Sequence, residues 1–219
     1  MEKIGKKMTL VELWKYKREQ KELVREIDCP LSNPMHVRFD SIIGLDVLDY
    51  DKGSYQVSRI YEYTRTANGK QFVFTDYDLF DRNSQATLRL RVNDGSVLLL
   101  TEYASDDLRN GGIYDVLKQT NIDKVLHDDE TDVEYQRIAD LDHPWNASVR
   151  ALDDDHNGKM TAANAIENKK IEYWDFSRQA VDEAGQTFEE FVFAEADWTD
   201  YRITLWKGRE IAPEVINIV

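Results

Sequence analysis

The sequence predicts an α+β protein that is predominantly antiparallel β-structure: two related β-meander modules, barrel- or sandwich-like, with an N-terminal helix and an irregular acidic connector. The main observation is an internal match. Residues 61–65 read aromatic, acidic, aromatic, hydroxyl and arginine, and residues 174–178 repeat these types in order. Phe-Val-Phe follows both copies after a glycine, and a third strand matches between 88–92 and 201–205. A duplicated sheet pattern is typical of a scaffold or binding architecture.

The first predicted unit, residues 1–30, is an amphipathic helix. Thr9-Leu10-Val11-Glu12 has the pattern of a capping box, in which the threonine and glutamate side chains satisfy the first free amides. Apolar residues recur at helical spacing until Cys29-Pro30 ends the helix, because proline disfavours α geometry in the residue before it. Basic residues gather on the other face of 9–27. The helix either covers adjacent β-structure, or contacts a partner or an anionic membrane surface peripherally.

The first meander is predicted over residues 37–104. Asn68-Gly69 and Asn93-Asp94-Gly95 favour tight hairpin turns, because these residue types tolerate positive φ. Apolar and polar residues alternate beside the turns, as in Leu88-Arg89-Leu90-Arg91-Val92. This alternation predicts strands with one buried face and one face in water.

Residues 105–168 change character and are predicted to be the acidic connector. The stretches 114–119 and 162–168 are candidate short helices, and the acidic run 127–132 is predicted to be a solvated loop. The second meander follows over residues 169–219. Its first turn is longer than its counterpart, as hairpin tips tolerate insertion.

Composition limits the classes of function. The net charge is −14, and because residues 1–27 carry +3, the rest of the chain carries −17. Such an acidic body repels phosphates, which argues against nucleic-acid binding and is compatible with a basic protein partner. No stretch approaches the ~20 apolar residues of a membrane span, and the single cysteine, Cys29, suits a reducing compartment. We therefore expect a cytoplasmic protein.

Six residues of the internal match are candidates for binding a ligand or a partner. An arginine that ends an aromatic strand can hold a carboxylate through two hydrogen bonds, or it can stack on a ring. One interpretation is a duplicated binding face. The other is structural, with each arginine in an ion pair or packed over a neighbouring ring. The six residues are Tyr61, Tyr63, Arg65, Trp174, Phe176 and Arg178.

The best candidate for a metal site is residues 153–158, which resemble the start of an EF-hand calcium loop. The candidate ligands are Asp153, Asp155 and Asn157. However, Asn164 occupies the position of the bidentate glutamate on which calcium affinity depends. We therefore expect no cofactor, with calcium as the alternative. The structural interpretation is an acidic turn leading into a helix capped by Thr161.

The C-terminal residues 170–219 resemble a known family. The resemblance rests on Tyr173-Trp174-Asp175-Phe176-Ser177-Arg178, Phe191-Val192-Phe193 and Trp206-Lys207-Gly208-Arg209-Glu210. The family is a set of uncharacterised bacterial proteins whose genes often neighbour those of PspA-type membrane-stress proteins. The resemblance implies a cytoplasmic, β-rich accessory protein of an envelope-stress system, with a PspA-type protein as its partner and no catalytic residues to carry over.

These observations favour a non-enzymatic cytoplasmic adaptor or binding protein with a protein partner. No nucleophile–base pair, no histidine or cysteine cluster and no phosphate-binding glycine loop is visible, so an enzyme is not expected. Two alternatives remain. One is a β-barrel that binds a small molecule or lipid, with the aromatic residues of the match lining a cavity. The other is an acidic, immunity-type inhibitor of a basic protein.

Overall fold

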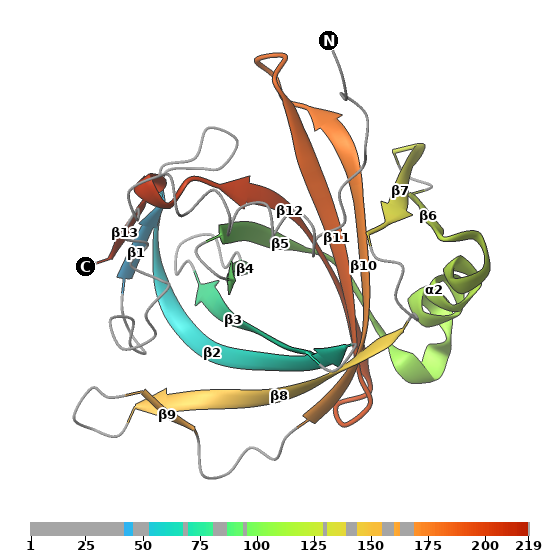
Figure 1. The fold of residues 1–219 in the computed structure, drawn as a ribbon, viewed down its shortest axis with the longest axis horizontal. Coiled ribbons are helices and arrows are strands. Elements are labelled where there is room, and N and C mark those ends of the chain that lie inside the picture. The colour runs from blue at the N-terminus through green and yellow to red at the C-terminus, as the bar shows by residue number, and fades with distance from the viewer. Residues whose placement is uncertain are drawn as a thin grey trace.

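The computed structural model places most of the described residues in one antiparallel sheet, within which eight strands close a barrel (Figure 1). Closure depends on β8, which pairs with both β10 and β2. The predicted antiparallel β-structure and its barrel-like form are confirmed. In order around the barrel the strands are β2 (Gly53–Ala67), β3 (Lys70–Phe80), β4 (Thr87–Asn93), β5 (Ser96–Asp107), β12 (Arg202–Ile211), β11 (Thr187–Asp197), β10 (Lys169–Val181) and β8 (Trp145–Asp154).

The structure describes part of the chain, and the remaining elements flank the barrel. The predicted helix within residues 1–30 lies outside the described residues. The described residues are 42–45, 53–67, 70–80, 87–93, 96–128, 131–138, 144–154, 160–162 and 169–218. The flanking elements are β1 (Ile42–Leu45), η2 (Leu108–Asn110), α2 (Gly112–Asp123), β6 (Val125–Asp128), β7 (Val133–Arg137), β9 (Met160–Ala162), η3 (Pro213–Val215) and β13 (Ile216–Ile218).

The segment 105–168 is not the irregular connector that its composition predicts. It contains β8, a wall of the barrel, together with the β6–β7 hairpin and α2, which confirms the helix expected near 114–119. The acidic run at 127–132 is not simply a loop, because His127 and Asp128 pair with Glu134 and Val133. The strands β6 and β7 are short, and packing against the outer face of β10 and β11 holds them. Tertiary pairing therefore overrides the local composition.

The buried apolar side chains of the described residues form three clusters. One lies inside the barrel; it includes Tyr63, Phe74 and Trp206. A second lies on the outer face of β2–β5, where Tyr77 and Leu90 pack with Ile216 of β13. Both faces of β2–β5 are therefore buried over much of their length, which corrects the prediction that one of them meets water.

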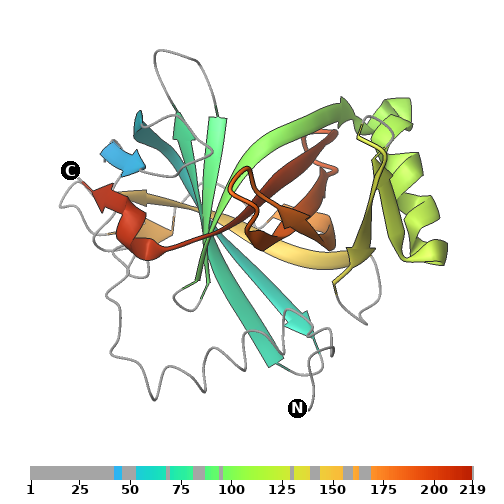
Figure 2. The same cartoon turned by 90° about the horizontal axis from the view of Figure 1, so that it is seen from above.

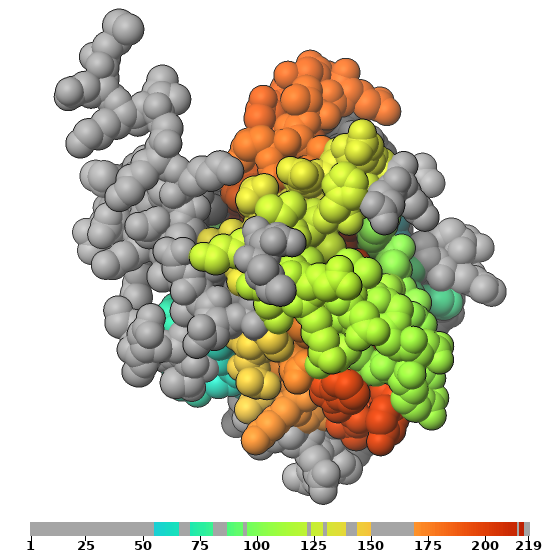
Figure 3. Space-filling view, turned by 90° about the vertical axis from the view of Figure 1, so that its right-hand side faces the viewer, coloured from blue at the N-terminus to red at the C-terminus, as the bar shows by residue number. Residues whose placement is uncertain are grey.

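The third apolar cluster lies between the outer face of β10–β12 and the elements α2, β6 and β7. Trp174 and Phe176 are fully buried there against Leu117 of α2. Figure 2 shows α2 on the far side of these strands from the barrel interior, and Figure 3 shows α2 with the β6–β7 hairpin covering this face.

Among the described residues, no helix has the length and hydropathy needed to cross a membrane.

The first strands of the two copies face opposite sides of the sheet, whereas Phe74 and its counterpart Phe193 both point into the barrel. In the first copy Tyr63 pairs with Phe74, and both point into the barrel. In the second copy Phe176 pairs with Val192, one position away from the matching Phe193. Two residues separate β2 from β3, whereas five separate the paired ends of β10 and β11. This change from an even to an odd number shifts the register by one residue, so Trp174 and Phe176 lie on the outer face while Phe193 stays inside.

Candidate functional site

Five charged side chains meet inside the barrel. Asp76 and Asp78 project from β3, Arg89 and Arg91 from β4, and Glu195 from β11. Each alternates along its strand with residues that face the outer clusters, so the period-two geometry of strands brings all five into the interior. None is more than 8% exposed. We call these five residues the charged cluster.

Arg91 joins the two sides of the charged cluster. Its Nε and Nη2 donate to the two carboxylate oxygens of Asp76, at 2.8 and 2.7 Å. Nη2 also donates to Oε1 of Glu195 at 2.9 Å, and Nη1 donates to the hydroxyl of Tyr173. The guanidinium carbon lies 4.4 Å from the ring centre of Phe74. Rings thus surround a cation that two carboxylates neutralise.

Arg89 makes a second set of contacts nearer to the end of the barrel. Its Nε donates to Asp78 at 2.7 Å, and its Nη1 donates to Oε2 of Glu195 at 2.8 Å. Nη1 also lies 3.3 Å from Asp76, and the guanidinium carbon lies 3.9 Å from the ring centre of Trp206. The hydroxyl of Tyr63 donates to Glu195 at 3.4 Å. Glu195 therefore bridges both arginines.

Burial and ion pairing set the ionisation of the charged cluster. Burial raises the pKa of Asp76 above its ordinary value, although Arg91 and Arg89 oppose the shift. Burial also acts to raise the pKa of Glu195, but the two guanidinium groups outweigh it and hold that pKa below its usual range. Burial and the charge of Glu195 raise the pKa of Tyr63, so its phenol stays protonated and remains a donor. Three carboxylates thus share two guanidinium groups.

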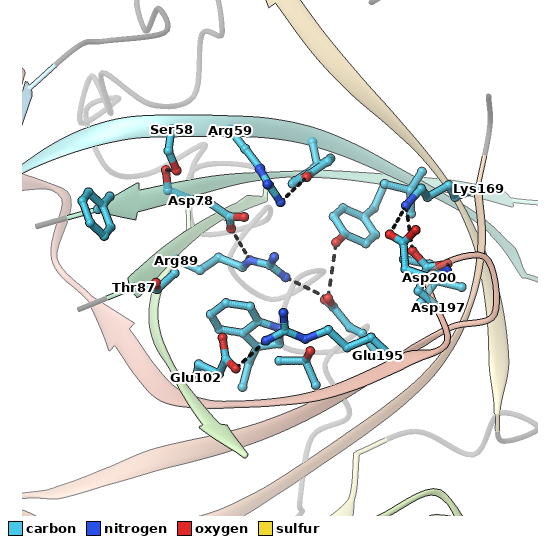
Figure 4. A pocket seen from close by; sticks show the side chains of 18 residues that line it. Ser58, Arg59, Asp78, Thr87, Arg89, Glu102, Lys169, Glu195, Asp197 and Asp200 are labelled. Carbon is cyan, nitrogen blue, oxygen red and sulfur yellow. Dashed lines mark hydrogen bonds and ion pairs between the residues drawn. The ribbon is translucent and has the colours of Figure 1, made fainter. Parts of the chain in front are cut away.

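A cavity of about 420 Å³ opens at the end of the barrel beside the charged cluster (Figure 4). Its floor includes Arg89, Asp78 and Glu195, and its walls include Tyr63 and Trp206. All eight barrel strands contribute to the lining, and Asp200 adds to it from the turn between β11 and β12. The other lining residues are Ser58, Arg59, Tyr61, Phe80, Thr87, Glu102, Val149, Lys169, Ile171, Asp197, Asp200, Arg202 and Thr204. This volume lies in the ~300–1,000 Å³ range of small-ligand sites.

Two strand irregularities shape this cavity. The pairing of β2 with β3 shifts register between Val57 and Arg59, and that of β12 with β5 shifts between Leu205 and Trp206. A β-bulge bends its strand and re-aims the adjacent side chains, and bulges are over-represented at the rims of barrels. Here the side chains of Ser58, Arg59 and Trp206 all reach the lining.

Ion pairs line the mouth of the cavity. Lys169 donates to Asp197 at 3.0 Å and to Asp200 at 2.5 Å, and Arg202 donates to Glu102 at 2.7 Å. Partial burial acts to raise the pKa of Asp197, but hydrogen bonds from Lys169 and from the amide of Thr199 hold it below its ordinary value. The mouth is therefore strongly polar.

We expect Asp197→Asn to destabilise the fold at pH 7 by about 1 kcal/mol or less, because the ion pair is only partly buried. Since the folded-state pKa of Asp197 is lowered, its contribution is present above the unfolded pKa of about 3.9 and is lost as pH falls through the folded-state value. Urea denaturation at neutral and acidic pH measures this difference. The variant Glu183→Gln, at an exposed loop residue, serves as the control. A deficit in Asp197→Asn that persists at low pH would show that the ion pair is not its cause.

The six candidates of the sequence match are divided by the fold. Tyr61 and Tyr63 line the cavity. Trp174 and Phe176, which the barrel alternative also placed in a cavity wall, instead lie in the cluster beneath α2. The same sequence pattern thus supplies a cavity wall in one copy and a core in the other.

The two arginines of the match have structural contacts. Arg65 stacks on Trp145, with 4.1 Å between its guanidinium carbon and the ring centre. Arg178 donates to Glu190 at 2.6 Å and lies over the ring of Tyr135 at 5.3 Å. Neither lines the cavity. These positions fit the structural interpretation of the pair.

The candidate calcium ligands fall at a strand hairpin. Asp153 lies in β8 and pairs with Thr161 of β9, so Thr161 is in a strand and does not begin a helix. Asp155 and Asn157 lie outside the described residues. Within the part of the chain that the structure describes, no group of three or more His, Cys, Asp or Glu side chains could hold a metal.

The charged cluster itself is what sequence reasoning missed. The alternating Asp76-Tyr77-Asp78 and Arg89-Leu90-Arg91 look like the solvated faces of ordinary strands. One signal was available: these acidic and basic residues alternate with large apolar residues in strands predicted to be neighbours, and they pair directly, Asp76 with Arg91 and Asp78 with Arg89. Cross-strand pairs of opposite charge stabilise a sheet wherever they lie, so this signal does not reveal burial.

The fold and the site together define a class: a closed, eight-stranded antiparallel barrel with a charged interior and a cavity at one end. Comparison with protein-family models, curated proteins and solved structures finds no match to this chain. The resemblance of residues 170–219 to the family beside PspA-type genes stays a prediction.

Proposed function

We propose that this protein is a non-enzymatic binding protein whose barrel holds a small polar molecule. The observation that carries the proposal is the cavity of about 420 Å³ beside a buried charged cluster. Barrels of about eight strands have interiors that side chains fill or that hold one small ligand. Here side chains fill one part of the interior, and the cavity occupies the other.

The lining of the cavity supports a polar ligand over a lipid chain. A lipid chain needs an apolar wall, whereas this lining carries charged side chains at its floor and its mouth. The ring of Trp206 also lines the cavity, so a bound molecule would lie against its indole.

Binding is tested by adding a library of small polar metabolites and recording melting temperature and tryptophan fluorescence. We expect a ligand that raises the melting temperature and changes the fluorescence of Trp206. Trp206→Phe should lose that fluorescence change, while Trp198→Phe, at an exposed tryptophan against α2, should keep it. The proposal fails if no compound binds, or if binding gives the same signal and affinity in Trp206→Phe.

A protein partner remains the first expectation from the sequence. The segment predicted to bind it, the basic helix expected over residues 9–27, lies outside the described residues, and so does the peripheral membrane contact expected of that segment. A PspA-type partner, cytoplasmic localisation and the immunity-type alternative also stay predictions from the sequence. Affinity purification from the native host, with and without residues 1–30, tests them together.

A further inference from the structure

We infer that the ligand of the barrel is a small zwitterion, such as an α-amino acid, held by Arg59 and Asp78. This inference rests on the proposed function and specifies its ligand class. Most of the cationic side chains that line the cavity already have carboxylate partners, since Lys169, Arg202 and Arg89 each form ion pairs.

Arg59 is the exception among the lining cations. In the described ranges no carboxylate lies within ion-pair distance of it. Its Nη1 donates a hydrogen bond to the hydroxyl of Tyr61 at 3.5 Å. The register shift at the start of β2 brings its side chain into the lining. A guanidinium group without a carboxylate is a ready site for one, because its planar N–H groups match both oxygens.

Asp78 supplies the opposite charge. It is 8% exposed, and Oδ1 accepts the hydrogen bond from Nε of Arg89. No described side chain donates a hydrogen bond to Oδ2, and Figure 4 shows the carboxylate at the cavity. A nearly buried carboxylate oxygen of this kind accepts hydrogen bonds from an ammonium group strongly, since the surroundings lack competing water.

The two groups stand side by side. Arg59 and Asp78 are direct cross-strand partners of β2 and β3, and directly paired residues on one face have Cβ atoms about 4.5–5.5 Å apart. They form no ion pair, because Arg59 points to Tyr61 and Asp78 points to Arg89 (Figure 4). An α-amino acid carries its carboxylate and ammonium groups on neighbouring atoms, so it matches a neighbouring cation and anion. The rings of Tyr61 and Trp206 offer the adjoining wall to its side chain.

Calorimetric titration with the standard L-amino acids, each tested singly, examines this inference on the unaltered protein. For each amino acid that binds, its N-acetyl derivative lacks the ammonium charge and its carboxamide lacks the carboxylate. We expect the zwitterion to bind and each derivative to bind about ten- to a hundredfold more weakly, the range for losing one charged hydrogen bond.

Two variants assign the charges to residues. Arg59→Gln should weaken binding of the zwitterion by the same factor as converting its carboxylate to a carboxamide does. Asp78→Asn should weaken it by the same factor as N-acetylation does, and the asparagine keeps an oxygen for Arg89. Arg109→Gln, at an exposed arginine paired with Asp107, should bind normally. If no amino acid binds but another metabolite does, the inference is overturned and the proposed function stands. If nothing binds, both fail.

Discussion

Replacing Arg91 with methionine is expected to destabilise the fold by about 3–5 kcal/mol, the cost of removing one partner from a buried ion pair. Arg91 is 5% exposed and holds both Asp76 and Glu195. Without it, Asp76 keeps only Arg89, at 3.3 Å, while burial still disfavours its charge. Methionine preserves most of the apolar stem, so the loss reports mainly on the charge. Equilibrium denaturation in urea measures it.

Two further variants separate the charge effect from a packing effect. The double variant Arg91→Met/Asp76→Leu also removes the carboxylate that lost its partner, so its fold should be more stable than that of Arg91→Met alone. Arg109→Met removes an exposed arginine whose pair is with Asp107, and no measurable change is expected. A double variant no more stable than the single one would mean that an uncompensated carboxylate is not the cause.

Replacing Trp174 with alanine is expected to cost about 3–5 kcal/mol, because a large buried ring leaves a cavity that its neighbours cannot fill. Trp174 is fully buried beneath α2, with its ring 5.8 Å from that of Tyr114. Its Nε1 also donates to Asn121 at 3.3 Å. The substitution therefore removes packing and a hydrogen bond between the barrel and α2. Thermal and urea unfolding, followed by circular dichroism, measure the loss.

Trp198 provides the matched control for Trp174. Its ring lies 5.1 Å from the same Tyr114, in the same edge-to-face arrangement, but Trp198 is 41% exposed. Trp198→Ala should therefore cost clearly less than Trp174→Ala, because it removes much less buried area. Ligand binding in the barrel should be retained in every Trp174 variant that folds, because Trp174 does not line the cavity. Equal losses of stability in Trp174→Ala and Trp198→Ala would contradict the difference in burial between the two rings.

Local sequence signals predict most of the strands correctly. The turns after residues 67 and 93 separate β2 from β3 and β4 from β5, as Asn-Gly and Asp-Gly sequences indicate. The strands β10, β11 and β12 also follow the predicted second meander. These signals succeed because turn chemistry and alternation act over a few neighbouring residues.

The same local signals predict only part of the candidate site. Tyr61 and Tyr63 were identified through the internal match, and they do line the cavity. Trp174 and Phe176 were identified by the same argument and lie outside it, because a hairpin loop of odd length shifts the register by one residue. Glu195, which bridges both arginines of the charged cluster, was not identified at all.

The sequence alone determined that this protein is built from antiparallel hairpins and where most of them turn, since those choices depend on residues next to each other in the chain. Only the tertiary structure decided that β8 closes the strands into one barrel and that Asp76, Asp78, Arg89, Arg91 and Glu195 meet inside it. The reason is that strand periodicity says which residues share a face, whereas barrel closure decides whether that face meets water or other side chains.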